Sequence, residues 1–316
     1  MSKHVCIIGG SGFVGRAIVR KAIHHGYGVT VACRHPERSR ELQVEGARLA
    51  RVDITDGHGL DEAVQRADTV INLVGLLFEK GRYSFTAAHV RGTEHVLAAC
   101  QRAGVRQYLH MSALGAGQVP DSAYATTKAG AEARVRSSGL DWTIFRPSII
   151  YGEGDSFFNK FKQMTAMLPV LPVIAGETRF QPVWVNDVAR AFVTSIGNRH
   201  VKGQTFELGG PDIYTFRELL EILMKTLGRK RLLVPVPYFA ARIMAAFMQF
   251  LPTPPLTPDQ LILLGWDNVV EGEPFPAIFG TPAPLEAILP TYIRASRPES
   301  LQQQLDTSRS HYRKQG

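Results

Sequence analysis

Apolar and polar positions follow two alternating patterns through the first half of the chain. Short runs that are apolar on both faces are typical of strands buried in a parallel sheet. The segments between them repeat apolar residues every three or four positions, which predicts helices. The predicted strands are 4–9, 28–33, 47–54, 69–75, 107–112 and 141–147, and the predicted helices are 13–25, 37–43, 57–67, 84–103 and 122–138. This alternation predicts an α/β fold with a doubly wound parallel sheet.

The pattern changes after Pro147, where proline and glycine become frequent and the predicted elements are more mixed. We therefore expect a first domain at 1–150 and a smaller C-terminal region at 151–294. This region covers the cleft of the first domain on its substrate side and crosses back to the sheet. Residues 295–316 are polar and poor in apolar side chains, which predicts a disordered tail.

The charge and the cysteine content narrow the function classes. The chain has 316 residues, of which 36 are basic and 28 acidic, so the formal net charge is +8. No dense Lys/Arg block with interleaved aromatic residues occurs, and we expect no nucleic-acid partner. The three cysteines are sparse and indicate a reducing, cytoplasmic compartment. A strand begins almost at once and no run of about twenty apolar residues occurs, so neither a signal peptide nor a transmembrane helix is expected. His89, His95 and His110 lack metal-ligand spacing, so we expect no metal site.

A glycine-rich loop follows the first predicted strand. Gly9, Gly12 and Gly15 are spaced G-x-x-G-x-x-G and lead into a helix. Glycine permits a tight turn and a close approach of the backbone to a pyrophosphate, while the helix directs its N–H groups at the phosphates. The alternative is a glycine-rich turn without a ligand, but the strand–loop–helix context favours a Rossmann dinucleotide site. The loop residues expected to contact the dinucleotide are Gly9, Ser11, Gly12, Phe13, Val14 and Gly15.

The end of the second strand indicates which dinucleotide binds. An acidic residue there would hold the ribose hydroxyls of NAD(H). The sequence has Arg34 at that place, with Arg38 one helical turn further on. Because a guanidinium group suits a 2′-phosphate, we favour NADP(H), with NAD(H) as the second candidate. The alternative is two surface arginines.

The next two strand ends supply further candidates for cofactor binding. Asp53 could accept a hydrogen bond from the adenine amino group, with Ile54 against the ring, or it could simply cap the strand end. Val74 and Gly75 close the fourth strand, where a glycine lets the cofactor lie against the backbone.

Tyr124 and Lys128 stand four residues apart in "YATTK" on the helix predicted at 122–138. Residues at this spacing share a helix face, and an ammonium group beside a phenol is expected to lower the pKa of the phenol. With the glycine loop, this Y-x-x-x-K motif resembles the short-chain dehydrogenase/reductase superfamily, in its extended or atypical branch. The resemblance implies that Tyr124 donates or accepts a proton and that Lys128 holds the nicotinamide ribose.

Several further segments resemble the family of the nucleotide-binding accessory subunit of respiratory complex I, which has bacterial members of NAD-dependent epimerase/dehydratase type. They include "VINLVGLLFEKGRYSF", "QYLHMSALGA", "RPSIIYGEGDSFFNKF" and "QPVWVNDVARAF", and the resemblance runs from Val5 to about Arg294. It implies that Arg34 binds the 2′-phosphate and that the segment from Arg146 to Gly152, with Pro147 and Ile149, lies beside the carboxamide. The resemblance to extended dehydrogenases also implies a dimer through 84–103 and 122–138.

The resemblance leaves the catalytic serine open. The usual strand-end pattern aligns with "QYLHMSALGA" in two registers. In one register Ser112 is the catalytic serine, and in the other Ala113 occupies that position. The second register would remove one hydrogen-bond donor to the substrate oxygen and cost roughly two to three powers of ten in rate.

The segment 238–264 contains a helix with a narrow polar stripe formed by Arg242 and Gln249. Burial in the C-terminal region is one interpretation, and a surface for a protein partner or a membrane is the other. Two functions therefore stay open. One is an NADPH-dependent oxidoreductase that acts on an unidentified small molecule through Tyr124 and Lys128. The other is a non-catalytic dinucleotide-binding subunit at the periphery of the inner membrane.

Overall fold

A seven-stranded parallel sheet forms the centre of the molecule within the described residues, 3–251 and 254–294 of this computed structural model. The order across the sheet is β11-β6-β5-β4-β1-β2-β3. The strands are β1 (His4–Ile8), β2 (Gly28–Cys33), β3 (Arg48–Arg51), β4 (Thr69–Asn72), β5 (Gln107–Met111), β6 (Asp141–Pro147) and β11 (Gln204–Leu208). The predicted doubly wound α/β fold is thereby confirmed. The tail expected at 295–316 lies outside the described residues.

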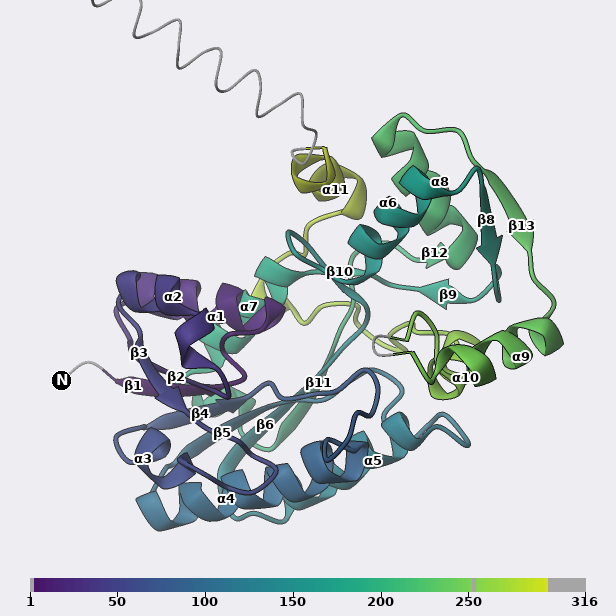
Figure 1. Cartoon of the computed structure of the whole chain (residues 1–316). Helices are drawn as coiled ribbons and strands as arrows, with labels where there is room; N and C mark the ends of the chain where they lie inside the picture. The colour runs from purple at the N-terminus through teal and green to yellow at the C-terminus, as the bar shows by residue number, and fades with distance from the viewer. Residues whose placement is uncertain (1–2, 252–253, 295–316) are drawn as a thin grey trace, which may run out of the picture.

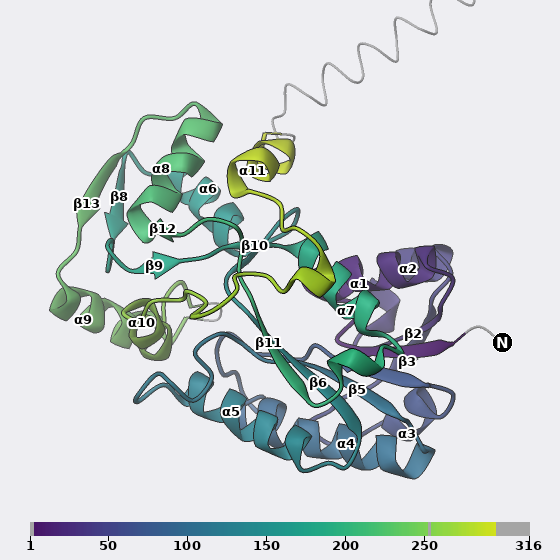
Figure 2. The same ribbon diagram turned by 180° about the vertical axis from the view of Figure 1, so that it is seen from behind.

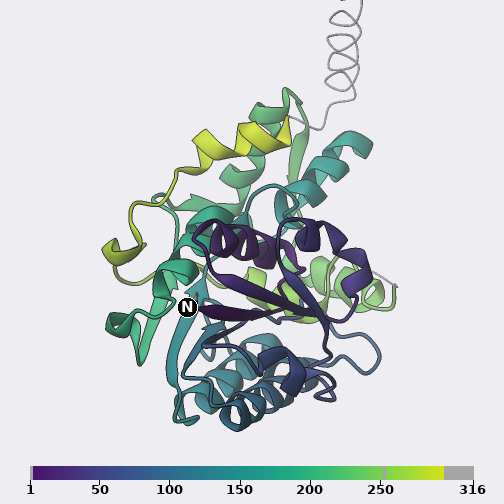
Figure 3. The same ribbon diagram turned by 90° about the vertical axis from the view of Figure 1, so that its left-hand side faces the viewer.

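Two helical layers cover the two faces of this sheet (Figures 1 and 3). One layer consists of α1 (Phe13–His24), α2 (Arg40–Val44) and α7 (Val185–Ser195). The other consists of α3 (Leu60–Val64), α4 (Gly92–Ala103) and α5 (Ala123–Arg136). Each layer encloses its own apolar core, because the strands present buried side chains alternately to both faces.

The C-terminal region lies beyond the carboxyl ends of β4, β5 and β6 (Figure 1). Within the described residues it holds three two-stranded sheets, which pair β7 (Ile150–Tyr151) with β10 (Val183–Trp184), β9 (Arg179–Phe180) with β12 (Tyr214–Thr215), and β8 (Val170–Val173) with β13 (Leu232–Pro235). Its helices are α6 (Phe157–Met167), α8 (Phe216–Leu227), α9 (Tyr238–Met248), α10 (Pro258–Leu264) and α11 (Leu285–Ile293). Helix α7 and strand β11 of the central layers follow residue 150 in sequence, so the chain crosses back to the sheet before the region is complete.

Several elements differ from the predicted ones. The helix expected at 37–43 is a 3-10 turn at Pro36–Arg38 followed by the short α2. The helix expected at 84–103 begins with a π-helical segment, η2 (Thr86–Arg91), before α4. In the C-terminal region, the segment 179–185 holds two separate strands, β9 and β10, because Pro182 between them has no N–H to donate and the two strands pair with different partners. The short 3-10 segments η3 (Arg199–Val201) and η4 (Ala277–Phe279) complete the described elements.

Cys6 and Cys100 lie in the same apolar core, and Cys33 lies in the core on the other face of the sheet. Cys6, Cys33 and Cys100 are buried free thiols.

Over residues 3–251 and 254–294, no helix combines the length and the apolar composition that crossing a bilayer would require. No group of three or more potential metal ligands occurs in the same part of the chain.

Candidate functional site

The glycine loop joins β1 to α1 through two positions that only glycine suits. Gly9 has a φ of +79°, in the left-handed region that other residues rarely adopt. A Cβ atom at Gly15 would lie 2.5 Å from the carbonyl oxygen of Gly9, so Gly15 permits the close packing of helix against loop. The N-cap residue Gly12 provides no side-chain cap, and the first turn of α1 carries no acidic residue. The helix N-terminus therefore keeps N–H groups and a positive dipole end for an anion.

A cavity of about 250 Å³ lies at the carboxyl ends of the central strands, in front of this loop. Parallel α/β sheets bind their ligands at this edge. Eight of the predicted cofactor residues line it: Gly9, Ser11, Gly12, Arg34, Asp53, Ile54, Val74 and Gly75. The predicted residues Phe13, Val14, Gly15, Arg38, Pro147 and Ile149 lie outside its lining. Phe13 borders the "RPSIIYG" segment, since a Cβ at Gly152 would come 3.6 Å from the Phe13 ring.

Arg34 lies at the outer end of this cavity with its charge free for a ligand. Its guanidinium carbon sits 4.5 Å from the centroid of the Tyr83 ring. No carboxylate among the described residues forms an ion pair with Arg34. Arg38 is exposed on the far side of the 3-10 turn. The donor chemistry of the cavity, with an uncapped helix end and an unpaired guanidinium, therefore fits a dinucleotide that bears several phosphates.

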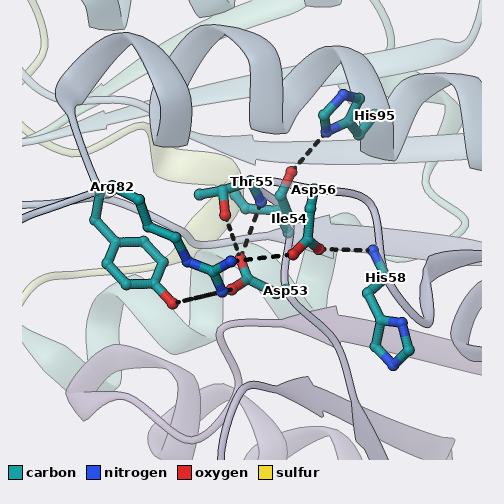
Figure 4. A network of polar contacts seen from close by, with 8 residues as sticks. Asp53, Ile54, Thr55, Asp56, His58, Arg82 and His95 are labelled. Atoms are coloured by element: carbon teal, nitrogen blue, oxygen red, sulfur yellow. Dashed lines mark hydrogen bonds and ion pairs between the residues drawn. The ribbon is translucent and has the colours of Figure 1, made fainter.

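The carboxylate of Asp53 is engaged by protein donors on both oxygens (Figure 4). One oxygen accepts hydrogen bonds from the backbone N–H of Thr55 at 3.0 Å and from its hydroxyl at 2.7 Å. The other accepts from Arg82 at 2.7 Å and from the Tyr83 hydroxyl at 3.0 Å. Burial opposes ionisation, but the hydrogen bonds of Thr55 and Tyr83 and the charge of Arg82 together lower the pKa of Asp53. The contacts to Thr55 are those of a strand-end cap, the alternative interpretation of this residue.

Arg82 and Tyr83 belong to a short hairpin that the sequence analysis did not single out. Lys80 and Tyr83 exchange two backbone hydrogen bonds of 3.0 and 3.1 Å. The hairpin places the Tyr83 ring in the cavity wall and brings the Arg82 guanidinium into an ion pair with the Asp53 carboxylate. The sequence signal was the "EKGRY" turn at 79–83, in the loop that follows β4, with an aromatic residue next to a cation.

Tyr124 and Lys128 lie together on the first turns of α5, beside the inner end of the cavity. The Lys128 ammonium is 6.0 Å from the centroid of the Tyr124 ring and donates a 3.0 Å hydrogen bond to the carbonyl of Met111. The same ammonium would lie 3.3 Å from a Cβ at Gly75, so the pair borders the cavity lining.

The expected lowering of the tyrosine pKa is wrong for this structure. Burial raises the pKa of Tyr124 to about 12, and the nearby Asp259 carboxylate adds to the shift. Burial also lowers the pKa of Lys128 to about 8, which weakens its ability to stabilise a phenolate. Tyr124 is therefore a neutral phenol at physiological pH.

Asp259 reaches this site from α10, a helix of the C-terminal region. Its carboxylate accepts hydrogen bonds from the backbone N–H of Ala123 at 2.7 Å and from the hydroxyl of Ser122 at 3.2 Å. A carboxylate is favourable at a helix N-terminus, where it offsets the unpaired N–H groups. The neighbouring Gln260 donates to the carbonyl of Leu77 beside the cavity at 3.0 Å. The helix α10 thus bridges the two sides of the site.

His89 lies in the π-helical segment η2 and connects the cavity wall to α5. Its Nε2 accepts a 3.0 Å hydrogen bond from the backbone N–H of Leu76, so the ring proton is on Nδ1. Nδ1 is 3.0 Å from the hydroxyl of Thr127, which donates in turn to the carbonyl of Ala123 at 2.7 Å. Burial and the charge of Lys128 lower the pKa of His89 to about 2, so the ring is neutral. The sequence analysis considered His89 only as a metal ligand. The sequence gives little indication of its bridging role, because π-helical segments have no recognised sequence pattern.

Ser112 faces the interior of the protein. It is 3% exposed, and its hydroxyl has no hydrogen-bond partner of acceptable geometry among the described residues. The hydroxyl lies close to the buried Glu132 carboxylate. Burial opposes ionisation of Glu132, but Arg146 chiefly, with Ser112, lowers its pKa. Ala113 is partly exposed. This placement favours the register in which Ala113 occupies the position of the catalytic serine.

Known proteins are similar in sequence to this chain over most of its length. A family model described as NAD(P)H-binding matches residues 9–164. The Arabidopsis thaliana protein named NADH dehydrogenase (ubiquinone) 1 alpha subcomplex subunit 9, mitochondrial, is 33% identical over 282 residues, which cover 84% of this chain and 70% of that protein. The ceramide reductase of Caulobacter vibrioides is 29% identical, with 74% of this chain and 73% of that protein covered.

Comparison with a solved structure bears on the fold of the chain and not on its function. The UDP-glucose 4-epimerase of Thermus thermophilus, in complex with NAD, superposes with a TM-score of 0.67 at 21% identity and covers 93% of this chain and 100% of that chain. The fold and the site therefore define an NAD(P)-binding protein of the short-chain dehydrogenase/reductase superfamily. Within that superfamily, the chain belongs to the family of NADH dehydrogenase 1 alpha subcomplex subunit 9. Across five relatives of that kind, the chain spans 62% to 70% of their length.

Proposed function

We propose that the chain is an NADP(H)-dependent reductase of a small carbonyl compound. The observation that carries the proposal is the cavity at the strand ends, which has phosphate-binding chemistry at its outer end and borders a Tyr–Lys pair at its inner end. Gly9, Gly12 and the N-terminus of α1 would hold the pyrophosphate, and Arg34 would hold the 2′-phosphate. The bound dinucleotide would supply the hydride.

The residues of the chain would supply the proton. Because its pKa is about 12, Tyr124 holds its proton at neutral pH, which is the protonation state that a proton donor in a carbonyl reduction requires. Lys128 would hold the ribose and orient the phenol. The names of two relatives, a ceramide reductase and a 2-alkyl-3-oxoalkanoate reductase, support the direction of the reaction.

A second candidate is a dinucleotide-binding subunit without turnover. The placement of Ser112 favours it, because Ala113 offers no hydroxyl to a substrate oxygen. Family membership favours it as well, since relatives are named as subunits of NADH dehydrogenase. On this proposal the chain would act at the periphery of the inner membrane. A dimer through α4 and α5 is proposed on the resemblance alone, and sedimentation velocity tests it.

The cofactor proposal is tested by replacing Arg34 with alanine and titrating NADPH and NADH by calorimetry. Charge-assisted hydrogen bonds to a phosphate contribute about 1.5–3 kcal/mol, so Arg34→Ala should weaken NADPH binding by roughly tenfold to a hundredfold. NADH affinity should stay nearly unchanged, because NADH lacks the 2′-phosphate.

Arg38→Ala is the matched control, since Arg38 lies outside the cavity lining. It removes the same charge one helical turn away and should change NADPH affinity by less than about threefold. An Arg34→Ala variant that binds NADPH as tightly as the unchanged protein does would sink the NADP(H) preference.

A further inference from the structure

The helix α9 exposes large apolar side chains to solvent and buries small ones against the protein. Ala241 and Ala245 are fully buried, where they pack with Leu261 of α10. Phe239, Ile243 and Phe247 stand four residues apart and are 70%, 57% and 75% exposed. Such exposed stripes of large apolar residues are unusual on a soluble surface and mark a contact with another apolar phase.

The strand pair β8–β13 continues this apolar surface. Leu232 pairs with Val170, and Val234 pairs with Pro172. Because side chains alternate between the faces of a strand, Leu232, Val234 and Val170 project together on the side away from the core. They are 65%, 37% and 42% exposed. The chain runs from β13 straight into α9, and both lie at the margin farthest from β1, β2 and β3 (Figures 1 and 2). We call the exposed sides of α9 and β8–β13 the outer face.

The segments that form the outer face carry basic residues and no acidic ones. Between residues 229 and 251 the chain carries Arg229, Lys230, Arg231 and Arg242, and no acidic residue. Arg242 lies on the exposed stripe itself, one position before Ile243. A second segment beside it, 156–174, carries two lysines and again no acidic residue. A protein partner would have to bury these charges, whereas an anionic lipid surface would offset them.

A basic hollow opens at the start of β13. Its volume is about 530 Å³, and Lys225, Arg229, Lys230 and Arg231 line it with Glu221 as its one acidic residue. Arg229 is fixed by hydrogen bonds to the carbonyl of Lys162 at 2.8 Å and to the hydroxyl of Thr165 at 2.7 Å. No carboxylate in the described part of the chain forms an ion pair with Lys225 or Lys230. The hollow is thus a shallow cationic depression at the edge of an apolar surface.

We propose that the outer face docks on a bilayer that contains anionic phospholipids. The aromatic and aliphatic side chains of α9 and β8–β13 enter the interfacial layer, and the basic hollow receives lipid phosphate groups. A short amphipathic helix with bulky apolar residues and flanking cations is suited to lie in the plane of that interface. This inference is independent of the reductase proposal, since the cofactor cavity contributes no residue to it.

The test uses the full chain and vesicle flotation. One set of vesicles contains phosphatidylcholine alone, and the other contains equal parts of phosphatidylcholine and phosphatidylglycerol. We expect flotation with the anionic vesicles, and weaker binding when salt screens the charges. Phe250 follows the end of α9 and is 82% exposed. The double variant Phe247→Glu/Phe250→Glu should reduce binding by at least about tenfold. Lys225→Ala/Lys230→Ala should reduce binding and also flatten its salt dependence.

Val44→Glu is the matched control, because Val44 is a 90% exposed apolar residue on α2, away from the outer face. It should float as the unchanged protein does. Thermal unfolding with and without NADPH shows that each variant is folded. Three results would overturn the proposal: no flotation of the unchanged protein, equal loss in Val44→Glu, or normal flotation of the phenylalanine variant. Self-association that the phenylalanine variant abolishes, without flotation, would assign the outer face to a second copy instead.

Discussion

At the scale of single residues, the neutral ring of His89 holds the cavity wall against α5. His89→Phe keeps an aromatic ring beside Phe85 and Tyr124, whose ring centroids lie 5.5 and 5.4 Å from that of His89. The substitution removes the hydrogen bonds of the ring to Leu76 and Thr127 and leaves the Leu76 N–H without its acceptor. We expect the free energy of unfolding to fall by about 2–3 kcal/mol, as measured by urea denaturation.

The substitution His58→Phe serves as its control, because His58 is exposed and its ring has no hydrogen bond among the described residues. It should alter stability by less than about 0.5 kcal/mol. Equal stability of His89→Phe and the unchanged protein would contradict the bridging role. Because the pKa of His89 is about 2, the ring does not titrate between pH 5 and 8. The pH profile of activity over this range should therefore be the same in His89→Phe as in the unchanged protein.

Asp53 gives a pH-dependent prediction. Its folded-state pKa lies below the unfolded value, so its contribution to stability is present at neutral pH and is lost as the pH falls through the folded-state pKa. Asp53→Ala should lower the free energy of unfolding by about 1–2 kcal/mol at pH 7, since Arg82 is largely exposed and solvent screens its charge. The difference between variant and unchanged protein should shrink towards pH 3.

The exposed pair Asp61–Arg102 provides the comparison for Asp53. Asp61→Ala should change stability by less than about 0.5 kcal/mol over the same pH range. A difference between Asp53→Ala and the unchanged protein that stays constant from pH 7 to pH 3 would show that the carboxylate charge contributes nothing.

Where a motif requires a particular residue type, the sequence led to residues that the structure brings together, and their contacts to a dinucleotide stay predictions. Gly9, Gly12, Arg34 and Gly75 all line the cavity as expected. The sequence left two roles open for Asp53 and did not reveal its partners, because Asp53 bonds to a hairpin 29 to 30 residues away along the chain as well as to its own strand end. Burial, which no local pattern reports, reversed the expected pKa shift of Tyr124.

At the scale of elements, two glycines of one loop should respond differently to the same substitution. A Cβ at Gly15 would meet the Gly9 carbonyl oxygen at 2.5 Å, so Gly15→Ala forces α1 away from the loop and should destabilise by about 3 kcal/mol or more. A Cβ at Gly12 would lie 3.3 Å from the same oxygen, and Gly12→Ala should keep stability within about 1 kcal/mol. Its methyl group would nevertheless obstruct the approach of a pyrophosphate.

Urea denaturation and NADPH titration separate these two effects. We expect Gly12→Ala to be folded and to bind NADPH at least about tenfold more weakly. Gly26→Ala is unsuitable as a control because its φ is +78°, whereas Gly272 has open space and an ordinary φ. Gly272→Ala should leave both readouts unchanged. Normal NADPH affinity in Gly12→Ala would remove the loop from the binding site.

Element prediction was reliable for the central sheet, because buried parallel strands and crossover helices have distinct periods. It was weaker in the C-terminal region, where strands of two residues carry too little pattern to be recognised. The helix at 238–248 shows a further limit. Its composition allowed either burial or exposure, and only packing against α10 decided that the alanines face inward.

At the scale of the whole molecule, α10 connects the outer face to the site. It packs against the buried side of α9, while Asp259 and Gln260 hold α5 and the loop after β4. A surface contact at α9 therefore lies one helix away from Tyr124. Substitutions at Phe247 and Phe250 should still leave NADPH affinity unchanged, because their side chains are largely exposed and effects at separated positions add independently.

Tyr124→Phe separates the two functions proposed for the molecule. In a reductase, loss of the proton donor should lower turnover by roughly two to four powers of ten while NADPH affinity changes little. Stability should rise slightly or stay constant, because the hydroxyl of Tyr124 has no hydrogen-bond partner among the described residues. The measurement is NADPH oxidation with a panel of carbonyl substrates, alongside the rate at which NADPH dissociates.

Tyr108→Phe is a control that removes a phenol outside the cavity lining, at a buried hydroxyl which accepts from Asn72 at 2.9 Å. It should reduce stability and spare turnover. If the unchanged protein oxidises NADPH with none of the carbonyl compounds and releases NADPH only over hours, the dinucleotide has a structural role. In that case Tyr124→Phe should leave vesicle binding and thermal stability as they are, and the family's association with NADH dehydrogenase becomes the better guide to function.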